Sequence, residues 1–297
     1  MISVPYLGEM LSLLAAVLWA LAIVLFRKSG ESVHPVALNT FKGVLAMVLY
    51  LPTLLLAGVP LFFDYPASGY AILLASGVIG IAVGDTLFFK CINTLGASAS
   101  ALISCLYSAF IIGMSYLWLG ERMSWLQLLG AVLIISAVME ATRAAGGKST
   151  DLKRRLGGFG WGVVSMAASA VAVVMMKPIL DEVPLLWALE VRLVGGVAAM
   201  LVLLALSPSR GAIVRSLTVP GSKVYTVSSS FIGGYVAMVC WLAGMKLTQA
   251  SVASALNETS SIFVLIFAAL VLRERVTPGR VIAILMAAGG ALLVTFG

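Results

Sequence analysis

The chain has 297 residues, of which 61% are hydrophobic and only 10% are charged. Soluble domains carry about 25% charged residues, so this composition excludes an ordinary soluble enzyme and indicates a protein built inside a membrane. The formal net charge of +7 would also suit a nucleic-acid-binding protein. The basic residues, however, lie in short connections beside apolar runs, where membrane orientation and lipid headgroups explain them. We therefore expect membrane lipids as partners and no nucleic acid.

Apolar runs of about 20 residues repeat along the chain, and each is long enough to cross a hydrocarbon core of about 30 Å. Backbone polar groups must be satisfied within lipid, so these runs are predicted to be transmembrane helices. The first has no basic residue before it and is expected to be retained rather than cleaved as a signal peptide. The ten predicted spans are residues 6–27, 36–57, 69–89, 95–119, 125–142, 157–177, 185–206, 224–245, 249–272 and 278–296.

The connections between these spans are short and contain turn-forming Gly, Pro and Ser. Ser124 and Thr277 are expected to cap the helices that follow them. A segment rich in Gly and basic residues, 144–156, lies at the midpoint and is predicted to link two units. The first unit is a five-helix repeat at residues 1–143, and the second is a five-helix inverted repeat at residues 157–297.

A repeated motif supports this division. Leu119-Gly120-Glu121-Arg122 recurs as Leu272-Arg273-Glu274-Arg275, 153 residues later, and each copy closes an apolar run. In the same register, Ala97-Ser98 matches Ala250-Ser251 and Gly80 matches Gly233. Because each copy has an odd number of spans, the second enters the membrane from the opposite side. The fold class predicted is therefore an all-α membrane protein with ten transmembrane helices in two inverted five-helix repeats.

The basic residues predict an orientation. Of the 19 Lys and Arg residues, 14 lie in the connections that follow the odd-numbered spans. The positive-inside rule places those connections in the cytoplasm and both termini outside it. We expect an integral, multi-pass protein of the cell (inner) membrane of a prokaryote. The 14 residues are Arg27, Lys28, Lys90, Arg143, Lys148, Lys153, Arg154, Arg155, Arg210, Arg215, Lys223, Arg273, Arg275 and Arg280.

These motifs resemble the EamA-type branch of the drug/metabolite transporter superfamily. The resemblance rests on the paired Glu-Arg endings, the small-residue starts of the fourth and ninth helices, and the ten-helix plan, and it covers nearly the whole chain. It implies a secondary transporter of small metabolites such as amino acids or related solutes. Two features depart from the family pattern. The fourth and ninth helices lack a central proline, and charge places the termini outside the cytoplasm, whereas many members are described with cytoplasmic termini.

The ninth span carries a polar stripe at helical spacing, Ser251, Ser254, Glu258 and Ser261, with Asn257 beside it. Glu258 lies about 12 Å along the helix from Ala250, at about 1.5 Å per residue, and so near the midplane. An ionised carboxylate there is unfavourable unless it meets water, a partner or a proton. We expect it to couple transport to protons or to bind substrate; the alternative is a packing role.

The equivalent region of the fourth span has no carboxylate. Ser104 and Tyr107 are candidate hydrogen-bonding residues of the cavity wall, although ordinary packing explains Tyr107 equally well. We expect the cavity to be lined mainly by the first, third, fourth, sixth, eighth and ninth helices. Trp19 and Trp241 lie deeper than the other tryptophans and are also candidates for its wall.

Four further charged residues fall well within spans. Asp85 follows Gly80 and Gly84, a spacing typical of close helix packing; it either faces the cavity or pairs with Lys90. Lys42 is expected to extend to the interface; the alternative is that it holds a substrate carboxylate or phosphate. Arg192 has the geometry to hold a carboxylate or phosphate at two points, and Glu190 cannot share its helix face. Glu121, Arg122, Glu274 and Arg275 sit at helix ends and are assigned to architecture rather than transport.

Several chemistries find no support in the sequence. There is no phosphate-binding Gly-rich loop, which excludes ATP hydrolysis by this chain. The lone His34 and the scattered Cys91, Cys105 and Cys240 form no metal-binding pattern. We expect no cofactor, no metal and no catalytic residues.

The predicted function is secondary transport by alternating access with a small-molecule substrate, and coupling to protons is left open. One rival is an integral-membrane enzyme or a translocator of lipid-linked substrates. Another is a receptor or assembly subunit that transports nothing. Because one chain supplies both halves, a functional monomer is compatible with this organisation.

Overall fold

The computed structural model describes residues 6–120, 122–144, 149–248, 250–274 and 277–296, and every regular element within these ranges is helical. Its N-terminal part contains α1 and α2, followed by two segmented helices and α7. The bounds are α1 Leu7–Ser29, α2 Pro35–Leu56, α3 Ala67–Gly77, η1 Val78–Asp85, α4 Thr86–Leu95, α5 Ala97–Ser104, α6 Leu106–Met114, η2 Ser115–Leu119 and α7 Trp125–Ala144.

The C-terminal part follows a similar order, but a short helix and a 3-10 turn follow α9, and within the described residues no π-helical stretch like η2 follows α14. The bounds are α8 Ser149–Leu180, α9 Leu185–Leu206, α10 Arg210–Arg215, η3 Ser216–Thr218, α11 Ser222–Phe231, η4 Ile232–Val236, α12 Ala237–Leu247, α13 Ala250–Glu258, α14 Ser260–Val271 and α15 Pro278–Phe296. The predicted linker, 144–156, is helical from Ser149 onward. Its basic residues favour helix formation and extend α8 beyond its apolar part.

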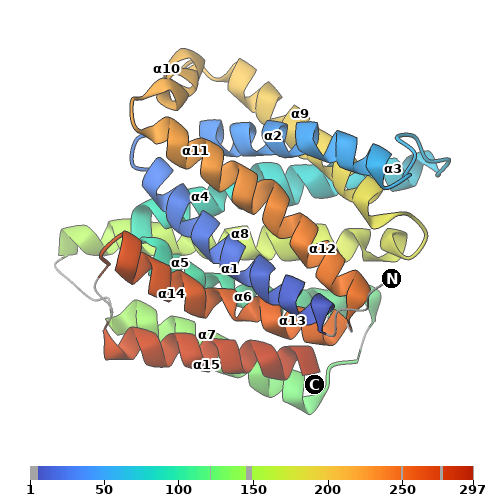
Figure 1. The fold of residues 1–297 in the computed structure, drawn as a ribbon. Coiled ribbons are helices and arrows are strands. Elements are labelled where there is room, and N and C mark those ends of the chain that lie inside the picture. Colours follow the sequence, from blue (N-terminus) through green and yellow to red (C-terminus); the bar gives the residue numbers. More distant parts are fainter. Residues whose placement is uncertain (1–5, 121, 145–148, 249, 275–276, 297) are drawn as a thin grey trace.

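Eight of the described helices are long and apolar enough to cross a membrane. Two further apolar helices among the described residues, Trp125–Met139 and Leu256–Val271, are shorter. α1 begins and α15 ends on the same side of the bundle (Figure 1). Large apolar side chains such as Val48, Leu55 and Leu203 are exposed on the outside, as expected where a helix faces lipid rather than water. The chain is therefore an integral multi-pass membrane protein.

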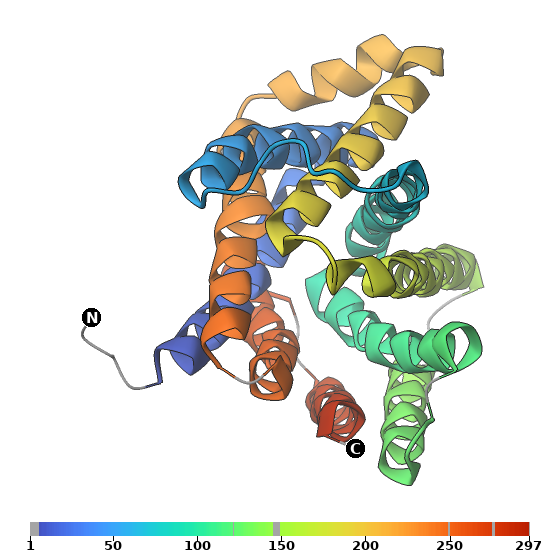
Figure 2. The ribbon, with the colours of Figure 1, turned by 90° about the vertical axis from the view of Figure 1, so that its right-hand side faces the viewer.

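The helices pack in pairs that are distant in sequence. α7 lies beside α15 and α1 beside α12, and α8 runs through the bundle against α4 (Figures 1 and 2). Small residues make the α7–α15 contact close: a Cβ added at Gly130 would lie 2.5 Å from the Gly290 carbonyl oxygen. Small residues of this kind let transmembrane helices approach where no water drives them together.

Two π-helical stretches occur at matching places in the two parts of the chain. The stretch η1 contains Gly80 and η4 contains Gly233, the glycines that the 153-residue repeat pairs. A Cβ on Gly80 would lie 2.9 Å from the Ala172 Cβ of α8, and one on Gly233 would lie 2.6 Å from the Ala22 Cβ of α1. Wider turns of this kind often mark functional sites. Here both place a glycine against a neighbouring helix.

The fourth and ninth predicted spans are interrupted without proline. Cys105 N donates to Leu102 O at 3.2 Å, and Thr259 N donates to Leu256 O at 3.2 Å, so each break is a tight turn between two helices. A hydroxyl group accompanies each break: Ser104 Oγ donates to Ala101 O at 2.7 Å, and Thr259 Oγ1 to Leu256 O. Side-chain hydroxyls that bond helix carbonyls often bend helices, which accounts for a break without proline at each place.

The start of α5 is capped from the other part of the chain. Glu274 accepts hydrogen bonds from Ala97 N at 2.8 Å, from Ser98 N at 3.2 Å and from Ser98 Oγ at 2.6 Å. A carboxylate at a helix N-terminus satisfies unpaired N–H groups and complements the helix dipole. The Glu-Arg ending of the second copy thus binds the small-residue helix start of the first. The equivalent pair, Glu121 with Ala250 and Ser251, involves residues outside those whose side chains the structure describes.

The two caps predicted from the sequence, at Ser124 and Thr277, are confirmed. Gln127 N donates to Ser124 Oγ at 3.1 Å, and Ser124 N donates to Gln127 Oε1 at 3.0 Å, which is a reciprocal capping box at the start of α7. Arg280 N donates to Thr277 Oγ1 at 3.4 Å at the start of α15. The sequence signals for these helix starts were therefore sufficient.

We predict that Glu274→Ala lowers the free energy of unfolding by about 1–3 kcal/mol, since it removes charge-assisted hydrogen bonds to a helix start. Thermal unfolding of the purified protein in detergent measures this change. Glu31→Ala is the matched control, because Glu31 forms only exposed ion pairs with Arg27 and Lys28, worth about 0–1 kcal/mol. Equal effects of the two substitutions would refute the capping role.

Candidate functional site

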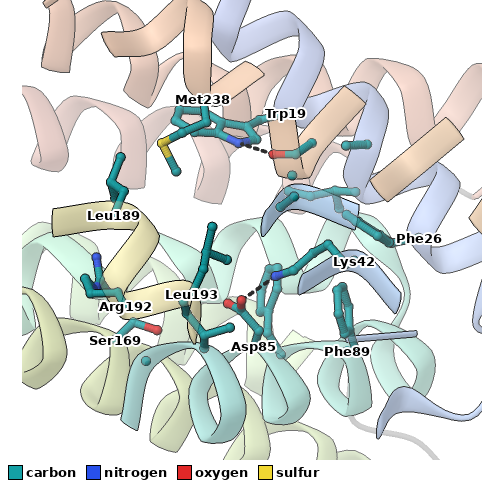
Figure 3. A pocket seen from close by; sticks show the side chains of 18 of the residues that line it. Trp19, Phe26, Lys42, Asp85, Phe89, Ser169, Leu189, Arg192, Leu193 and Met238 are labelled. Carbon is teal, nitrogen blue, oxygen red and sulfur yellow. Dashed lines mark hydrogen bonds and ion pairs between the residues drawn. The ribbon is translucent and has the colours of Figure 1, made fainter. Parts of the chain in front are cut away.

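A cavity of about 390 Å³ lies at the centre of the bundle. Its wall is formed by side chains from α1, α2, the η1–α4 segment, α6, α8, α9 and the η4–α12 segment (Figure 3). Most are apolar or aromatic, including Phe26, Phe89 and Met238. A cavity of this size, with a few polar groups on an apolar wall, is typical of a small-molecule site.

Lys42 and Asp85 form an ion pair in the wall of this cavity (Figure 3). The side chain of Asp85 is 34% exposed and that of Lys42 is 15% exposed, so the cavity reaches the carboxylate. Asp85 ends the π-helical stretch η1, whose wider turns rotate the residue toward α2. Lys42 also lies 5.4 Å from the ring centroid of Phe89.

This pairing decides between the alternatives for these residues. Asp85 does not pair with Lys90, whose amine instead lies 5.1 Å from the ring centroid of Trp161. The expectation that Lys42 extends to the interface was wrong, because its amine turns inward to the carboxylate. The physical reason is that a lone charge inside a membrane is unfavourable, so a cation and an anion within reach of one another form a pair.

Arg192 is the second cation of the cavity, and it is unpaired among the described residues. Its Nε atom is buried and has no hydrogen-bond partner, and none of the salt bridges found in the described ranges involves it. Gly80 makes room for the guanidinium, since a Cβ there would lie 3.2 Å from Nη2. Asp85 and Tyr107 lie within electrostatic range of it. Arg192 is thus held in the cavity wall, and its Nε–H donor is unused.

Asn39 of α2 stabilises the helix segment that carries Asp85. It was not identified as a site residue from the sequence. This fully buried side chain donates from Nδ2 to Ile81 O at 2.7 Å and to Thr86 Oγ1 at 2.9 Å. It thereby fixes the π-helical stretch that carries Asp85. A single Asn within an apolar span was the available signal, because a buried amide in a membrane requires a partner on another helix.

The two tryptophans predicted for the cavity wall, Trp19 and Trp241, differ in position. Trp19 lines the cavity, and its Nε1 donates to Gly233 O at 3.2 Å (Figure 3). Trp241 stacks at a tilt on Trp19, with ring centroids 6.0 Å apart. Trp241 itself is not among the described residues that line the cavity. It positions Trp19 rather than contacting the cavity.

Glu258 belongs to a second cavity, of about 470 Å³, toward the end of the bundle where α15 terminates. Ser108 Oγ donates to Glu258 Oε1 at 3.1 Å. The wall also contains Lys177 of α8 together with Arg122 and Gln127 near the start of α7. Tyr107 lines both cavities and so forms the partition between them.

The predicted set of cavity helices therefore needs correction. α2 and α9 contribute Lys42 and Arg192 to the central cavity, whereas the described part of the ninth span contributes nothing to its wall. The prediction favoured the ninth span because it carries a midplane carboxylate. Depth along a helix does not determine which face of that helix meets a given cavity, and the packing of Tyr107 separates Glu258 from the centre.

The remaining candidates lie around these cavities. Ser261 is buried and its Oγ donates to Glu258 O at 3.0 Å, while Ser104 bonds its own helix. The Oδ1 atom of Asn257 is buried without a partner. Arg122 was assigned to architecture, yet it lines the second cavity. The structure does not describe Glu121, Arg275 or the side chain of Ser254. Among the described residues, no three His, Cys, Asp or Glu side chains gather as a metal site would require.

We predict that Lys42 and Asp85 are energetically coupled. Asp85→Asn and Lys42→Met each leave one charge unpaired inside the membrane, so each destabilises the protein more than the double variant does, with a coupling energy of about 1–3 kcal/mol. Thermal unfolding of the four proteins gives this energy. The exposed pair Lys28–Glu31 provides the control cycle, for which about 0–1 kcal/mol is expected. Additive effects at Lys42 and Asp85 would contradict the pairing.

Comparison with known proteins agrees with this architecture. The EamA-like transporter family matches residues 6–142 and again residues 156–296. A protein of Archaeoglobus fulgidus described as an uncharacterized transporter is 22% identical over 270 residues, which is 90% of each chain. A solved crystal structure superposes with a TM-score of 0.67 over 97% of this chain and 98% of its own, at 17% identity, and so shares the fold. With both of its parts matched, the chain belongs to the EamA-like transporter family.

Proposed function

We propose that this protein is a secondary transporter that carries small metabolites bearing a carboxylate or similar anion, such as amino acids, through its central cavity. The observation that carries the proposal is Arg192, an unpaired guanidinium in the cavity wall. An unpaired cation inside a membrane is unfavourable and marks a binding site by default. A carboxylate at this position would form two parallel hydrogen bonds and compensate the charge.

The surroundings of Arg192 favour a mixed polar and apolar solute. The Lys42–Asp85 pair lies across from Arg192 in the same cavity (Figure 3). Asp85 retains exposed surface for a donor such as an amine, while Trp19, Phe26 and Phe89 provide an apolar wall. The cavity volume of about 390 Å³ suits a metabolite of modest size. An amino acid has the carboxylate, amine and side chain that such a wall would accept.

The organisation of the chain supports alternating access. We infer ten spans in two inverted five-helix repeats, residues 1–143 and 157–297, joined by a basic linker at 144–156. Matching π-helical stretches and matching helix breaks in the two parts are places where inverted repeats can rock about a shared site. The central and second cavities, divided by Tyr107, would then be successive parts of one route.

Orientation and assembly form part of the same proposal. The basic connections would lie in the cytoplasm and both termini outside it, in a prokaryotic cell membrane. A monomer would suffice, because both repeats belong to one chain. Membrane lipids would surround the apolar outer faces. No cofactor is needed for a carrier that draws on a solute or proton gradient.

We predict that a carboxylate-bearing ligand stabilises the wild-type protein and that Arg192→Gln abolishes this effect. A ligand at 100 times its Kd adds about 2.7 kcal/mol of apparent stability, which a thermal-shift screen of a metabolite library detects. Arg192→Lys should weaken binding, because an ammonium lacks the planar pair of donors. Arg210→Gln, an exposed change on α10, should keep it. A ligand retained by Arg192→Gln would refute the anchor.

Assays in liposomes separate the transporter proposal from its rivals. If liposomes containing the protein convert an added lipid chemically, the protein is an enzyme acting on lipid-linked substrates. Binding without any solute movement would instead indicate a receptor. Movement of the bound solute across the liposome membrane is the result that the transporter proposal requires.

Glu258 is proposed to couple transport to protons from the second cavity. Its carboxylate meets Ser108 and the cavity space, so it can exchange protons with the side on which α15 ends. We predict that Glu258→Gln changes both the rate of transport and its dependence on pH, measured as uptake into liposomes between about pH 5 and 8. Gln127→Glu, which adds a carboxylate to the same cavity, provides a comparison. Rates equal to wild type at every pH would exclude Glu258 from coupling.

A further inference from the structure

Besides Asp85 and Glu258, a third membrane-embedded carboxyl group, Glu190 of α9, is absent from the wall of both described cavities. The residue is 8% exposed. Its Oε2 atom is buried and accepts no hydrogen bond, and none of the salt bridges within the described ranges includes it. Unlike Glu258, which meets Ser108 and open cavity space, Glu190 is enclosed. An enclosed carboxyl without a partner requires an explanation.

The neighbours of Glu190 follow from its helix face. Leu186 and Leu193 lie about one turn before and after it on α9, and both pack against a cluster that contains Tyr50 and Tyr235. Glu190 therefore faces the same cluster between α2 and η4. Tyr50 is 2% exposed, its ring lies 5.2 Å from that of Tyr235, and its hydroxyl has no partner. Tyr50 thus belongs to the cluster that Glu190 faces, and its hydroxyl is a polar group of that cluster.

No cation compensates Glu190 from the elements packed against it. On α2, Lys42 is committed to Asp85. Arg192 belongs to α9 itself, but two residues correspond to about 200° around the helix, and it points toward Gly80 of η1 instead.

The other titratable or charged groups near this face offer no positive charge within reach. Tyr70 of α3 donates to Phe63 O, the hydroxyl of Tyr235 is shared with Thr53 at 2.6 Å, and Arg210 of α10 donates to Ala205 O. The one acid of η1, Asp85, is the partner of Lys42. An ionised Glu190 would thus be an unpaired anion within a membrane, which is strongly unfavourable.

We propose that Glu190 and Tyr50 form a proton-binding site, in which Glu190 is a neutral carboxylic acid in the conformation seen here. In the conformation seen here neither the Tyr50 hydroxyl nor Glu190 Oε2 has a hydrogen-bond partner among the described residues, so a protonated carboxyl brings a donor to a region that holds an unused acceptor, the Tyr50 oxygen. Tyr50 also lines the central cavity, so its hydroxyl connects the buried acid to the solute-binding space. The proton leaves toward the cavity when that region is hydrated, and Glu190 then becomes a carboxylate. The link to solute movement rests on the proposed transport function; the protonation itself does not.

Infrared spectroscopy of the purified protein in lipid tests the site directly. A protonated carboxylic acid gives a C=O stretching band distinct from that of a carboxylate, and Glu190→Gln should remove one such band at neutral pH. Glu258→Gln is the matched control and should leave that band in place. Tyr50→Phe should keep the band but shift it, because it removes the polar hydroxyl from the apolar cluster that Glu190 faces.

Two results would overturn the proposal. One is a carboxylic acid signal of the same intensity in wild type and Glu190→Gln. The other is stabilisation by sodium chloride, absent with choline chloride, that Glu190→Gln abolishes, since it would assign the site to a metal cation. If Glu190→Gln does not fold, a band unmoved in Tyr50→Phe contradicts the pairing. The band is measured without solute. If Glu190→Gln loses the band but the wild-type protein transports nothing, the transport function is refuted and the proton-binding site is not.

Discussion

A polar group inside a lipid bilayer has no water to bind, and this constraint governs where the polar side chains of this protein lie. Many hydroxyl groups donate to a carbonyl one turn earlier in their own helix, as Ser12, Thr40 and Thr295 do. Asn39 crosses to a neighbouring helix, and Lys42 and Asp85 satisfy each other. Against this background, the groups left without partners stand out. Arg192, Tyr50 and Glu190 are three of them, and all lie in or beside the central cavity.

Glycine determines how closely the helices around that cavity approach. A Cβ at Gly77 would overlap the Arg192 carbonyl oxygen, and one at Gly84 would lie 2.8 Å from Ser169 Oγ. The end of α3 is therefore packed tightly against α9, and η1 against α8, where Ser165 Oγ donates to Gly84 O at 2.7 Å. This close packing brings Asp85 and Arg192 to the same cavity, although they come from different parts of the chain.

The cap formed by Glu274 connects the two parts of the chain at the helices that carry the site. It joins the end of the ninth span, which carries Glu258, to the start of α5, whose continuation α6 carries Tyr107. The helices that carry Tyr107, which lies between the cavities, and Glu258 are thus joined by this one set of hydrogen bonds. The breaks at Cys105 and Thr259 lie between this cap and those residues. Bending there would move Tyr107 and Glu258 relative to the cap.

Composition, periodic apolar runs and the repeated Glu-Arg motif were enough to predict an all-helical membrane protein of this family, because span length and backbone satisfaction depend only on local sequence. The caps at Ser124 and Thr277 and the close packing at Gly80 and Gly84 were predictable for the same reason. The partners of charged residues were not. Whether Asp85 meets Lys90 or Lys42, and whether Glu258 shares a cavity with Arg192, depends on how each helix is rotated and which helix lies beside it. A π-helical stretch changes that rotation without a clear sequence signal, so only the tertiary structure decided which polar groups share the central cavity.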